Sequence, residues 1–501
     1  MVTGYARGPR GMRYDSSVTT FHVENFGCRA TQADGAALER QFETRGLARV
    51  PSAQADLVIL NTCTVTNSAD QDARAAIRRI QRQNPLAKII VTGCYAQRAP
   101  AEVAALPGVT SVVGNSHKNE LAELVLDENG LHPGTFVPLA RLALSDQPTT
   151  TDRQPALFVS DIFAHTELLA APVFESGTTH GPQADDRTRP NLKVQDGCDN
   201  RCSFCVIPSV RGASRSLQLP EIIREVNALV AAGYRELVIS GINLGRWGRD
   251  LAASRQPSAV SEFRKAHSAS RTPTFESLIR TILADTQLEK LRISSVEPMD
   301  WTDDLIALVA SSARIAKHAH VPLQSGSDAV LRRMHRKYRP WHYREKIEKI
   351  RAAMPTAAIG ADVMAGFPGE TDAEFEATYR LIEDLPFTYL HVFTYSARPG
   401  TPAATMPNQV PVHVARERNK VLRDLASGKK LAFMRSFLGK QLEAITLNVF
   451  HNGDDGVFTE TLTDNYQKLY LKGRHEPNRW ITAKVKAVQD GRFVAEHPER
   501  D

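Results

Sequence analysis

The feature that most constrains this 501-residue chain is a short loop that carries three cysteines. Cys198, Cys202 and Cys205 lie within eight residues, in the spacing Cys-x3-Cys-x2-Cys. Three thiolates so placed can bind three irons of a [4Fe–4S] cluster and leave the fourth iron without a protein ligand. An open iron is what a cluster needs if it is to hold and reduce a small molecule. The spacing therefore predicts a redox cluster with one open coordination position.

Two other interpretations of the loop are weaker. Zinc sites usually pair their ligands as Cys-x2-Cys with a fourth Cys or His at a matching distance, and no such partner follows here. A disulfide is disfavoured because nothing marks the chain as secreted. No apolar stretch approaches the length of a membrane-spanning helix, and residues 1–17 lack the apolar run of a signal peptide. We therefore expect a disordered leader at 1–17 and a cytoplasmic protein without a membrane association.

The cysteine spacing resembles that of the radical S-adenosylmethionine (SAM) superfamily. The resemblance implies that the open iron holds SAM, whose one-electron reduction releases a 5′-deoxyadenosyl radical. It makes Cys198, Cys202 and Cys205 catalytic as well as metal ligands. It also implies a reducing partner such as flavodoxin or ferredoxin.

Residues 18–126 alternate apolar strands with amphipathic helices, which predicts a doubly wound parallel sheet. Cys28, Cys63 and Cys94 each follow the end of a predicted strand. Because the carboxyl ends of parallel strands lie at one edge of a sheet, we expect these cysteines to meet in space. They predict a second cluster with three protein ligands; the alternative is three buried structural cysteines. Strands are expected at 21–26, 56–60, 88–92 and 111–113, and helices at 36–44 and 69–83.

Two three-cysteine sites on one chain resemble the methylthiotransferase family. The sequence Asn-Thr-Cys-Thr-Val-Thr-Asn at 61–67 is similar to the MtaB branch, and Gly-Cys-Tyr-Ala-Gln at 93–97 supports it. One departure is Cys-Arg-Ala-Thr-Gln at 28–32, where the family usually has Cys-Lys-x-Asn-Gln. This departure changes a polar neighbour of the first cysteine and leaves the ligand itself in place.

The resemblance implies a transferase that uses two [4Fe–4S] clusters, SAM and a sulfur donor. Its product would be a methylthio group at C2 of N6-threonylcarbamoyladenosine, at adenosine 37 in the anticodon stem-loop of tRNA. Two related activities are alternatives: MiaB-like modification of isopentenyladenosine and RimO-like modification of a ribosomal protein. A non-enzymatic iron–sulfur protein that binds RNA is a third.

After a linker at 127–190, six βα repeats over 191–411 fit the partial (β/α)6 barrel of the radical-SAM superfamily. Residues 252–274 are expected to be a disordered insertion. Chemistry in βα barrels belongs at the carboxyl ends of the strands, so the resemblance implies SAM contacts there. Asp362 could instead be a structural carboxylate, and Arg211 could contact substrate. The candidate SAM contacts are Gly241, Asn243, Glu297, Gln324, Ser325, Asp362, Gly366 and Arg211.

The chain ends in a basic connecting helix at 412–437 and five short predicted strands within 438–498. Five short strands suggest a small barrel of the oligonucleotide-binding kind. It resembles the TRAM domain, with Asp-Asn-Tyr at 464–466; the alternative is a structural β-cap. A cluster of basic residues near 332–337 could bind phosphates or be a solvated helix face. The candidate RNA contacts are Asn465, Tyr466, Arg332, Arg333, Arg336 and Lys337.

Overall fold

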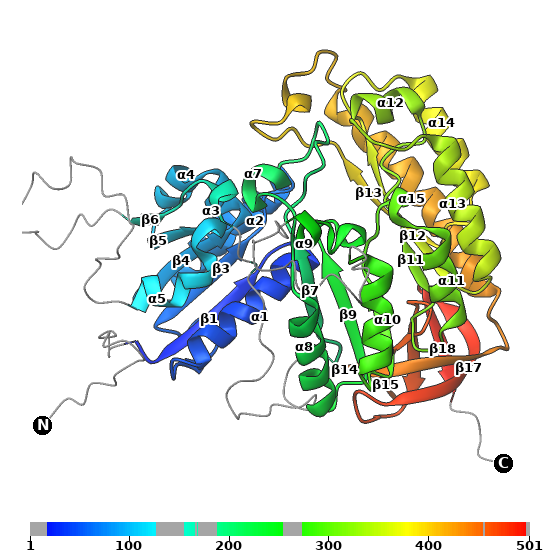
Figure 1. Ribbon diagram of the computed structural model, residues 1–501, viewed down its shortest axis with the longest axis horizontal. Coiled ribbons are helices and arrows are strands. Elements are labelled where there is room, and N and C mark those ends of the chain that lie inside the picture. The colour runs from blue at the N-terminus through cyan, green and yellow to red at the C-terminus, as the bar shows by residue number, and fades with distance from the viewer. Residues whose placement is uncertain are drawn as a thin grey trace, which may run out of the picture. The chain divides into compact units, whose positions relative to one another are not determined.

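The computed structural model describes residues 18–126, 155–165, 168, 188–253, 273–453 and 456–496 (Figure 1). The chain forms two compact units. The first comprises the described residues up to 168, with Gly197–Asp199 and Cys205–Arg215; the second comprises the remaining described residues. The predicted leader, most of the predicted linker and most of the predicted insertion lie outside the described residues. Among the described helices, none is both long and apolar enough to cross a membrane.

The first unit contains a six-stranded sheet in the order β2-β1-β3-β4-β5-β6, with every neighbouring pair parallel. All six residues of β3 are buried, as expected for a strand covered on both faces. The last strand, β6, lies within the stretch 127–190 that the sequence predicts to be a linker. This part of the stretch is a strand because it pairs with β5. The strands are β1 (Thr20–Asn25), β2 (Ala48–Arg49), β3 (Leu57–Thr62), β4 (Lys88–Gly93), β5 (Val109–Gly114) and β6 (Ala156–Phe158).

Alternate residues of β3 pack into different apolar clusters. Leu57 and Ile59 join a cluster with Phe42, while Val58 and Leu60 join another with Ile77. The alternation follows from the two-residue period of a strand, and it confirms a doubly wound sheet. The helical segments of this unit are α1 (Arg29–Glu43), α2 (Asn67–Gln83), α3 (Cys94–Arg98), α4 (Pro100–Ala104), η1 (Asn115–Glu120), α5 (Leu121–Leu126), η2 (Ile162–Ala164) and α7 (Ile207–Arg211).

The second unit contains the predicted partial barrel. Its strands form two sheets, β10-β9-β7-β8 and β11-β12-β13, and isolated parallel bridges join them at Leu291–Ile315 and Ser295–His320. The six strands β7, β9, β10, β11, β12 and β13 therefore lie side by side in the same order as in the sequence. This order confirms the predicted βα repeats. They are β7 (Asn191–Asp196), β9 (Glu236–Gly241), β10 (Lys290–Ile293), β11 (His318–His320), β12 (Ala358–Ala365) and β13 (Tyr389–Thr394), and β8 is Arg215–Ser216.

Helices follow the strands in turn. Four of them, α10, α11, α12 and α14, begin at a side chain that accepts a backbone hydrogen bond, such as Thr302 before α11 and Thr371 before α14. The helices are α8 (Leu219–Ala231), α9 (Arg249–Ala253), α10 (Phe275–Asp285), α11 (Asp303–Ser311), α12 (Asp328–Arg333), α13 (Pro340–Ala353), α14 (Asp372–Asp384) and α15 (Val412–Arg435), with short 3-10 helices η3 (Leu244–Arg246), η5 (Pro298–Asp300) and η6 (Pro402–Thr405).

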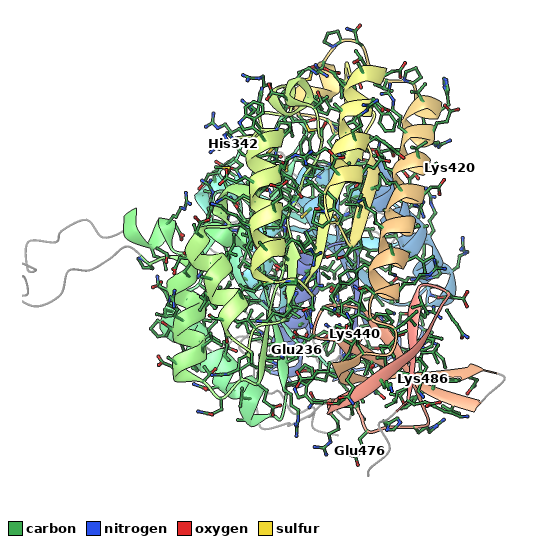
Figure 2. All side chains as sticks on the ribbon, turned by 90° about the vertical axis from the view of Figure 1, so that its right-hand side faces the viewer. Glu236, His342, Lys420, Lys440, Glu476 and Lys486 are labelled. Atoms are coloured by element: carbon green, nitrogen blue, oxygen red, sulfur yellow. The ribbon has the colours of Figure 1, made fainter. Side chains whose placement is uncertain are left out.

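The five carboxyl-terminal strands close into a small barrel in the order β14-β15-β16-β18-β17, as predicted. Its core contains Leu469, Val485 and Phe493, and Met434 and Phe437 from the end of α15 pack against them. Lys440 and Lys486 lie on its exposed surface, and Lys420 lies on the exposed side of α15 (Figure 2). The strands are β14 (Gln441–Gly453), β15 (Gly456–Thr463), β16 (Lys468–Lys472), β17 (Trp480–Gln489) and β18 (Arg492–Glu496).

The small barrel is fixed to the amino-terminal ends of the central strands. Arg292 on β10 is 1 % exposed, and it donates hydrogen bonds to the carbonyl oxygens of Thr463 (3.3 Å) and Asp464 (3.0 Å). The same guanidinium pairs with buried Glu236, which is labelled in Figure 2. Asn478 adds a hydrogen bond to the carbonyl oxygen of Gly233. Buried charge-assisted contacts of this kind hold one geometry.

Candidate active site

Three cysteines lie at the carboxyl edge of the sheet in the first unit. Cys28 follows β1 and precedes α1, Cys63 follows β3, and Cys94 follows β4 as the first residue of α3. Cys63 and Cys94 are buried, whereas Cys28 is exposed. Adjacent parallel strands bring these three turns together although the residues are far apart in the sequence.

Two glycines make the close approach of these turns possible. Gly27 has φ +100°, and a Cβ atom there would lie 2.4 Å from Cβ and 2.8 Å from Sγ of Cys63. Gly93 has φ +98°, and a Cβ atom there would lie 2.3 Å from the carbonyl oxygen of Thr62. Only glycine meets both demands, the left-handed backbone and the missing side chain. The Cys28 turn therefore packs directly on Cys63.

The three thiols lie close enough to interact electrostatically. Burial, followed by the charges of Cys94 and Cys28, raises the pKa of Cys63 to about 12. A metal group bound there would hold this sulfur as a thiolate, because the thiolate is the form that binds metals. All six cysteines are free thiols, which excludes the disulfide alternative in this structure.

The kind of metal group can be narrowed further. Within the described parts of the chain, no three Cys, His, Asp or Glu side chains are gathered closely enough to hold a single metal ion. Three sulfur donors are the ligand set of a [4Fe–4S] cluster that keeps one iron open, and the glycine turns leave space beside them.

Polar side chains contact two of these cysteines. Thr31 Oγ1 lies 3.5 Å from Sγ of Cys28, so the residue that departs from the family pattern still gives the first cysteine a polar neighbour. Asn115 Nδ2 donates to Sγ of Cys94 over 3.6 Å and to the carbonyl oxygen of Val210 over 2.8 Å. Such partners orient ligands and tune a bound cluster.

The cysteine loop after β7 is held by its backbone. In the first unit, the N–H of Cys198 donates to the carbonyl oxygen of Gly212 over 3.1 Å, and Gly197 has φ +69° with no room for a side chain against Ala213. In the second unit, Ser203 Oγ donates to the carbonyl oxygen of Arg333 over 2.7 Å. Cys198, Cys202 and Cys205 are all partly buried.

A pocket in the second unit contains Cys202 and Arg336. Arg336 donates to Sγ of Cys202 over 3.4 Å, pairs with Glu297 and contacts the Tyr338 hydroxyl. Burial would lower the pKa of Arg336, but Tyr338, Glu297 and Cys202 outweigh it and raise the pKa well above its ordinary value. The guanidinium is therefore a fixed positive charge beside a cluster ligand. The pocket is also lined by Asn200, Arg246, Met299, His335 and Lys337.

The predicted basic RNA contacts separate in the structure. Arg336 is only 8 % exposed, and its partners are Glu297 and Cys202. Arg333 is half-buried and binds both carboxylate oxygens of Glu374. Arg332 and Lys337 remain exposed, with Arg332 paired to Asp328.

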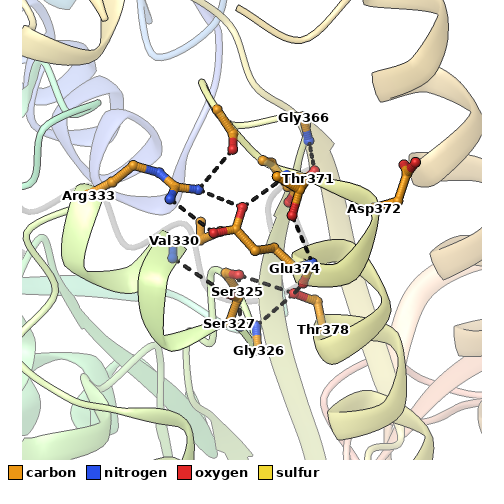
Figure 3. A network of polar contacts seen from close by, with 12 residues as sticks. Ser325, Gly326, Ser327, Val330, Arg333, Gly366, Thr371, Asp372, Glu374 and Thr378 are labelled. Atoms are coloured by element: carbon orange, nitrogen blue, oxygen red, sulfur yellow. Dashed lines mark hydrogen bonds and ion pairs between the residues drawn. The ribbon is translucent and has the colours of Figure 1, made fainter. Parts of the chain in front are cut away.

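Two predicted SAM contacts have structural roles. Ser325 is fully buried; its hydroxyl lies 3.1 Å from the Thr378 hydroxyl on α14 and accepts the N–H of Ser327 (Figure 3). Gly366 has φ +77°, and a Cβ atom there would lie 2.4 Å from Cβ of Ala415 on α15. Both residues shape the turns in which they lie, and their contact with SAM stays a prediction.

Other predicted contacts lie at strand ends. Gln324 is partly exposed with φ +62°, a conformation that costs a non-glycine residue about 1–3 kcal/mol and often marks a functional position. Asn243 is buried, and its N–H donates to Oε1 of Gln195 over 2.7 Å; a Cβ atom on Gly241 would also meet that side chain. Arg211 belongs to the first unit, where it is buried and pairs with Asp34.

One face of β11, β12 and β13 carries His320, Asp362 and His391 beside the aromatic residues Tyr389 and Phe393. His320 Nε2 lies 3.4 Å from Oδ1 of Asp362, and His320 Nδ1 lies 3.0 Å from the Ser295 hydroxyl. Asp362 is opposite His391 in the strand register, and the His391 side chain is exposed. We call His320, Asp362 and His391 the strand-face triad.

Aromatic rings lie next to this triad, toward the amino-terminal strand ends. Gly360 leaves room for Tyr389, since a Cβ atom there would lie 2.0 Å from Cζ of that ring. The Tyr389 hydroxyl lies 2.7 Å from Nε2 of His318, and the His318 ring is 4.6 Å from the Tyr466 ring. Sequence reasoning missed Tyr389 and His391, for which only the alternation along β13 was a signal.

The remaining predicted RNA contacts pack against protein. Tyr466 is partly buried, with φ +64° and Arg292 over its ring. Asn465 is 4 % exposed and donates to the carbonyl oxygen of Thr356 over 3.1 Å. These contacts attach the small barrel to the central strands, and they do not support RNA binding by these two side chains.

Comparison with known proteins assigns the chain to a class and a family. The profile of the radical SAM superfamily matches residues 192–382, and that of a family described as uncharacterized protein family UPF0004 matches residues 20–114. The matched segments define a radical-SAM enzyme with an additional amino-terminal domain.

Relatives span nearly the whole chain. It is 36% identical to threonylcarbamoyladenosine tRNA methylthiotransferase MtaB of Bacillus subtilis, over 95% of this chain and 94% of that protein. It is 35% identical to the protein of that name from Rickettsia prowazekii, over 85% and 87%. It is 34% identical to a tRNA-2-methylthio-N(6)-dimethylallyladenosine synthase of Novosphingobium aromaticivorans, over 86% and 87%. The chain belongs to the MtaB family of radical-SAM tRNA methylthiotransferases.

Proposed function

We propose that this chain transfers a methylthio group to C2 of N6-threonylcarbamoyladenosine at position 37 of tRNA. The observation that carries the proposal is the meeting of Cys28, Cys63 and Cys94 at one sheet edge, on a chain that has a second three-cysteine loop. The names of the relatives support both the reaction and the substrate. Each cysteine set would hold one [4Fe–4S] cluster, and the loop of Cys198 would also serve SAM.

The reaction explains why two clusters are needed. The C2–H bond of an adenine offers neither an acidic proton nor a leaving group. Acid–base catalysis alone could therefore not substitute sulfur for this hydrogen. When bound, the clusters supply an electron to cleave SAM and a sulfur atom for transfer. Methylthiolation would place the C2 hydrogen on 5′-deoxyadenosine, take the methyl group from a second SAM and release one electron as the C2–S bond forms, which the sulfur-supplying cluster would accept. A one-electron donor such as flavodoxin or ferredoxin and a sulfur donor are the partners that this balance requires, and the proposed location is the cytoplasm, where tRNA is modified.

The chain's own residues position and polarise these groups. Arg336 holds a positive charge against Cys202, and its ion pair with Glu297 fixes the guanidinium. Gln324, in its left-handed conformation, and the turn after β9 at Gly241 and Asn243 remain the proposed SAM contacts. Gly27 and Gly93 keep the turns of the other three cysteines close together.

The strand-face triad supports the threonylcarbamoyl substrate over the isopentenyl alternative. Threonylcarbamoyl carries hydroxyl, amide and carboxylate groups, whereas isopentenyl is wholly apolar. Placing an apolar chain against His320, Asp362 and exposed His391 would desolvate polar groups without new hydrogen bonds. A polar substituent would instead exchange hydrogen bonds with them.

The proposed RNA surface uses residues that are exposed. Lys337 lines the Cys202 pocket, Arg332 is exposed on α12, and the basic side chains on the exposed face of α15 include Arg416, Lys420 and Arg423. Phosphate contacts of this type set affinity and orientation and do not read sequence. The small barrel at 438–498 is proposed to contribute as a TRAM-like domain through its exposed lysines.

Anaerobic reconstitution with iron and sulfide, followed by SAM and dithionite, tests the proposal. Anticodon stem-loops with threonylcarbamoyladenosine, isopentenyladenosine or unmodified adenosine at position 37 are the substrates, and nucleoside mass spectrometry is the readout. We expect the 2-methylthio product only from the first. Product from isopentenyladenosine alone would support the MiaB-like alternative, and absence of 5′-deoxyadenosine from reconstituted protein would refute the enzymatic function.

Two cysteine variants separate the roles of the clusters. Cys63→Ala should still form 5′-deoxyadenosine but no methylthio product, because only the sulfur-supplying site is damaged. Cys202→Ala should lose both products. If Cys63→Ala still yields the methylthio product, the proposed sulfur source is wrong.

A further inference from the structure

Three buried charged side chains form a cluster beneath the cysteine site of the first unit. Asp34 on α1 accepts from Nζ of Lys118 over 3.1 Å and from the Arg211 guanidinium over 3.0 Å, both at Oδ2. Their exposed fractions are 1 %, 3 % and 2 %. Arg211 is the last residue of α7, and this helix directly follows the loop of Cys198, Cys202 and Cys205 in the sequence. We call these three residues the buried charge cluster.

Hydrogen bonds connect the buried charge cluster to two of the cysteine turns. Lys118 Nζ donates to Oδ1 of Asn61, two residues before Cys63, over 3.1 Å. Asn61 Nδ2 donates to the carbonyl oxygen of Thr31 over 2.7 Å, and Thr31 Oγ1 contacts Cys28. One path of polar contacts thus runs from Lys118 to the first two cysteine turns.

The third cysteine turn is connected from the other side. Asn115 Nδ2 bridges Sγ of Cys94 and the carbonyl oxygen of Val210, the residue before Arg211. Helices α7 and α3 also pack together, so the end of α7 lies close to the Cys94 turn. All three cysteine turns are therefore linked to the segment that carries Arg211.

Stability alone is a weak explanation for this arrangement. Removing charges from water costs several kcal/mol per ion, and well-packed apolar residues often stabilise a fold at least as well as a buried ion pair. Charge near a cluster, by contrast, changes how readily the cluster is reduced.

We infer that Arg211 is a positioning residue for the cluster at Cys28, Cys63 and Cys94: held by Asp34, it keeps a fixed positive charge beside that cluster. The inference rests on the proposed function, because it requires these three cysteines to hold a cluster. Asp34 and Arg211 then have opposite effects on the cluster. The cation stabilises the more negative, reduced state, and the carboxylate destabilises it.

Reduction potentials test the inference without an activity assay. The parent is the full chain with Cys198, Cys202 and Cys205 changed to Ala, so that only one cluster forms. Iron content and a spectroscopic redox titration are measured for the parent and for Arg211→Gln, Arg211→Lys and Asp34→Asn in that background. We expect a lower potential for Arg211→Gln, a higher one for Asp34→Asn and a value near the parent for Arg211→Lys.

The opposite signs distinguish electrostatics from loss of structure. If Arg211→Gln and Asp34→Asn shift the potential in the same direction, or neither shifts it, the inference is overturned. If Arg211→Gln retains no iron, the comparison of Arg211→Lys with Asp34→Asn decides, since both preserve the cation. A parent that takes up no iron refutes the proposed cluster itself, whereas an iron-loaded parent with insensitive variants refutes only the role of Arg211.

Discussion

The Arg336 guanidinium donates a hydrogen bond to the sulfur of Cys202, although 134 residues separate them in the chain. A second nitrogen of the same group pairs with Glu297. Of the basic residues predicted to contact RNA, Arg336 therefore lies nearest to the redox chemistry. We therefore expect Arg336 to affect SAM cleavage.

Changing Arg336 to Met removes a charge-assisted hydrogen bond, which is typically worth about 1.5–3 kcal/mol. If that interaction assists the reduction of SAM, 5′-deoxyadenosine formation should fall by about 10- to 100-fold. Affinity for tRNA should change little. The exposed neighbour Arg332 is the matched control, and Arg332→Met should retain SAM cleavage. A loss of tRNA affinity with normal SAM cleavage in Arg336→Met would support the RNA-binding hypothesis.

Gly27→Ala should selectively damage the cysteine site of the first unit. The new methyl group would overlap the Cys63 side chain, and alanine also tolerates φ +100° poorly. We expect iron content to fall by about half, with 5′-deoxyadenosine formation retained and the methylthio product lost, because one of two clusters is affected. Gly46→Ala is the matched control, since Gly46 has φ +86° but no atoms within 4 Å of an added Cβ. Equal losses in both variants would show that backbone strain, and not contact with Cys63, is responsible.

His391→Leu should reduce methylthiolation of threonylcarbamoyladenosine and leave SAM cleavage intact. The substitution replaces a polar, exposed member of the strand-face triad with an apolar side chain of similar size. Losing one hydrogen bond to a polar substituent would raise KM or lower kcat by roughly fivefold to tenfold. Kinetics with the modified stem-loop give the measurement, and His451→Leu on the small barrel is the control. An unchanged kcat/KM would remove His391 from substrate recognition.

Stability at acidic pH should depend on Glu374. Burial raises the pKa of this carboxyl, but hydrogen bonds from Arg333 and the Thr371 N–H outweigh it and leave the pKa below its ordinary value (Figure 3). A lowered folded-state pKa contributes stability above the ordinary carboxyl pKa of about 4.5, and that stability is lost as the pH falls through the folded-state pKa. The Tm difference between the wild type and Glu374→Gln should therefore shrink between about pH 7 and pH 3.5. Glu376→Gln, which removes only an exposed ion pair with Arg380, should show little difference at either pH.

The sequence predicts the strands and the cysteine positions because both depend on local patterns. Apolar runs such as Leu57–Thr62 end at glycine, asparagine or threonine, and the next residue is a cysteine or lies near one. Parallel topology then places these ends at one edge without further information. For the same reason the six βα repeats and the five strands of the small barrel occur in the predicted order within 191–411 and 438–498.

The buried polar residues could not be predicted in this way. Helix α1 begins at Arg29, whereas the sequence predicts a start at residue 36. The first turns were missed because they bury the polar residues Thr31 and Asp34 and so lack apolar periodicity. Asp34 meets Arg211 across 177 residues, and Arg336 meets Glu297 across 39. Nothing in the local sequence distinguishes these arginines from Arg332, which remains exposed. Burial of a charge is decided by partners that only the fold brings near.

The contact between the Tyr466 and His318 rings has a practical consequence for truncated proteins. Removing the carboxyl-terminal barrel would take away Tyr466 and the carbonyl groups that Arg292 contacts. The parts of β10 and β11 that the barrel covers would then be exposed to solvent, and the Arg292 guanidinium would lose those acceptors. A shortened enzyme would therefore lose contacts that hold its central strands. Its lost activity should not be taken as evidence about RNA affinity.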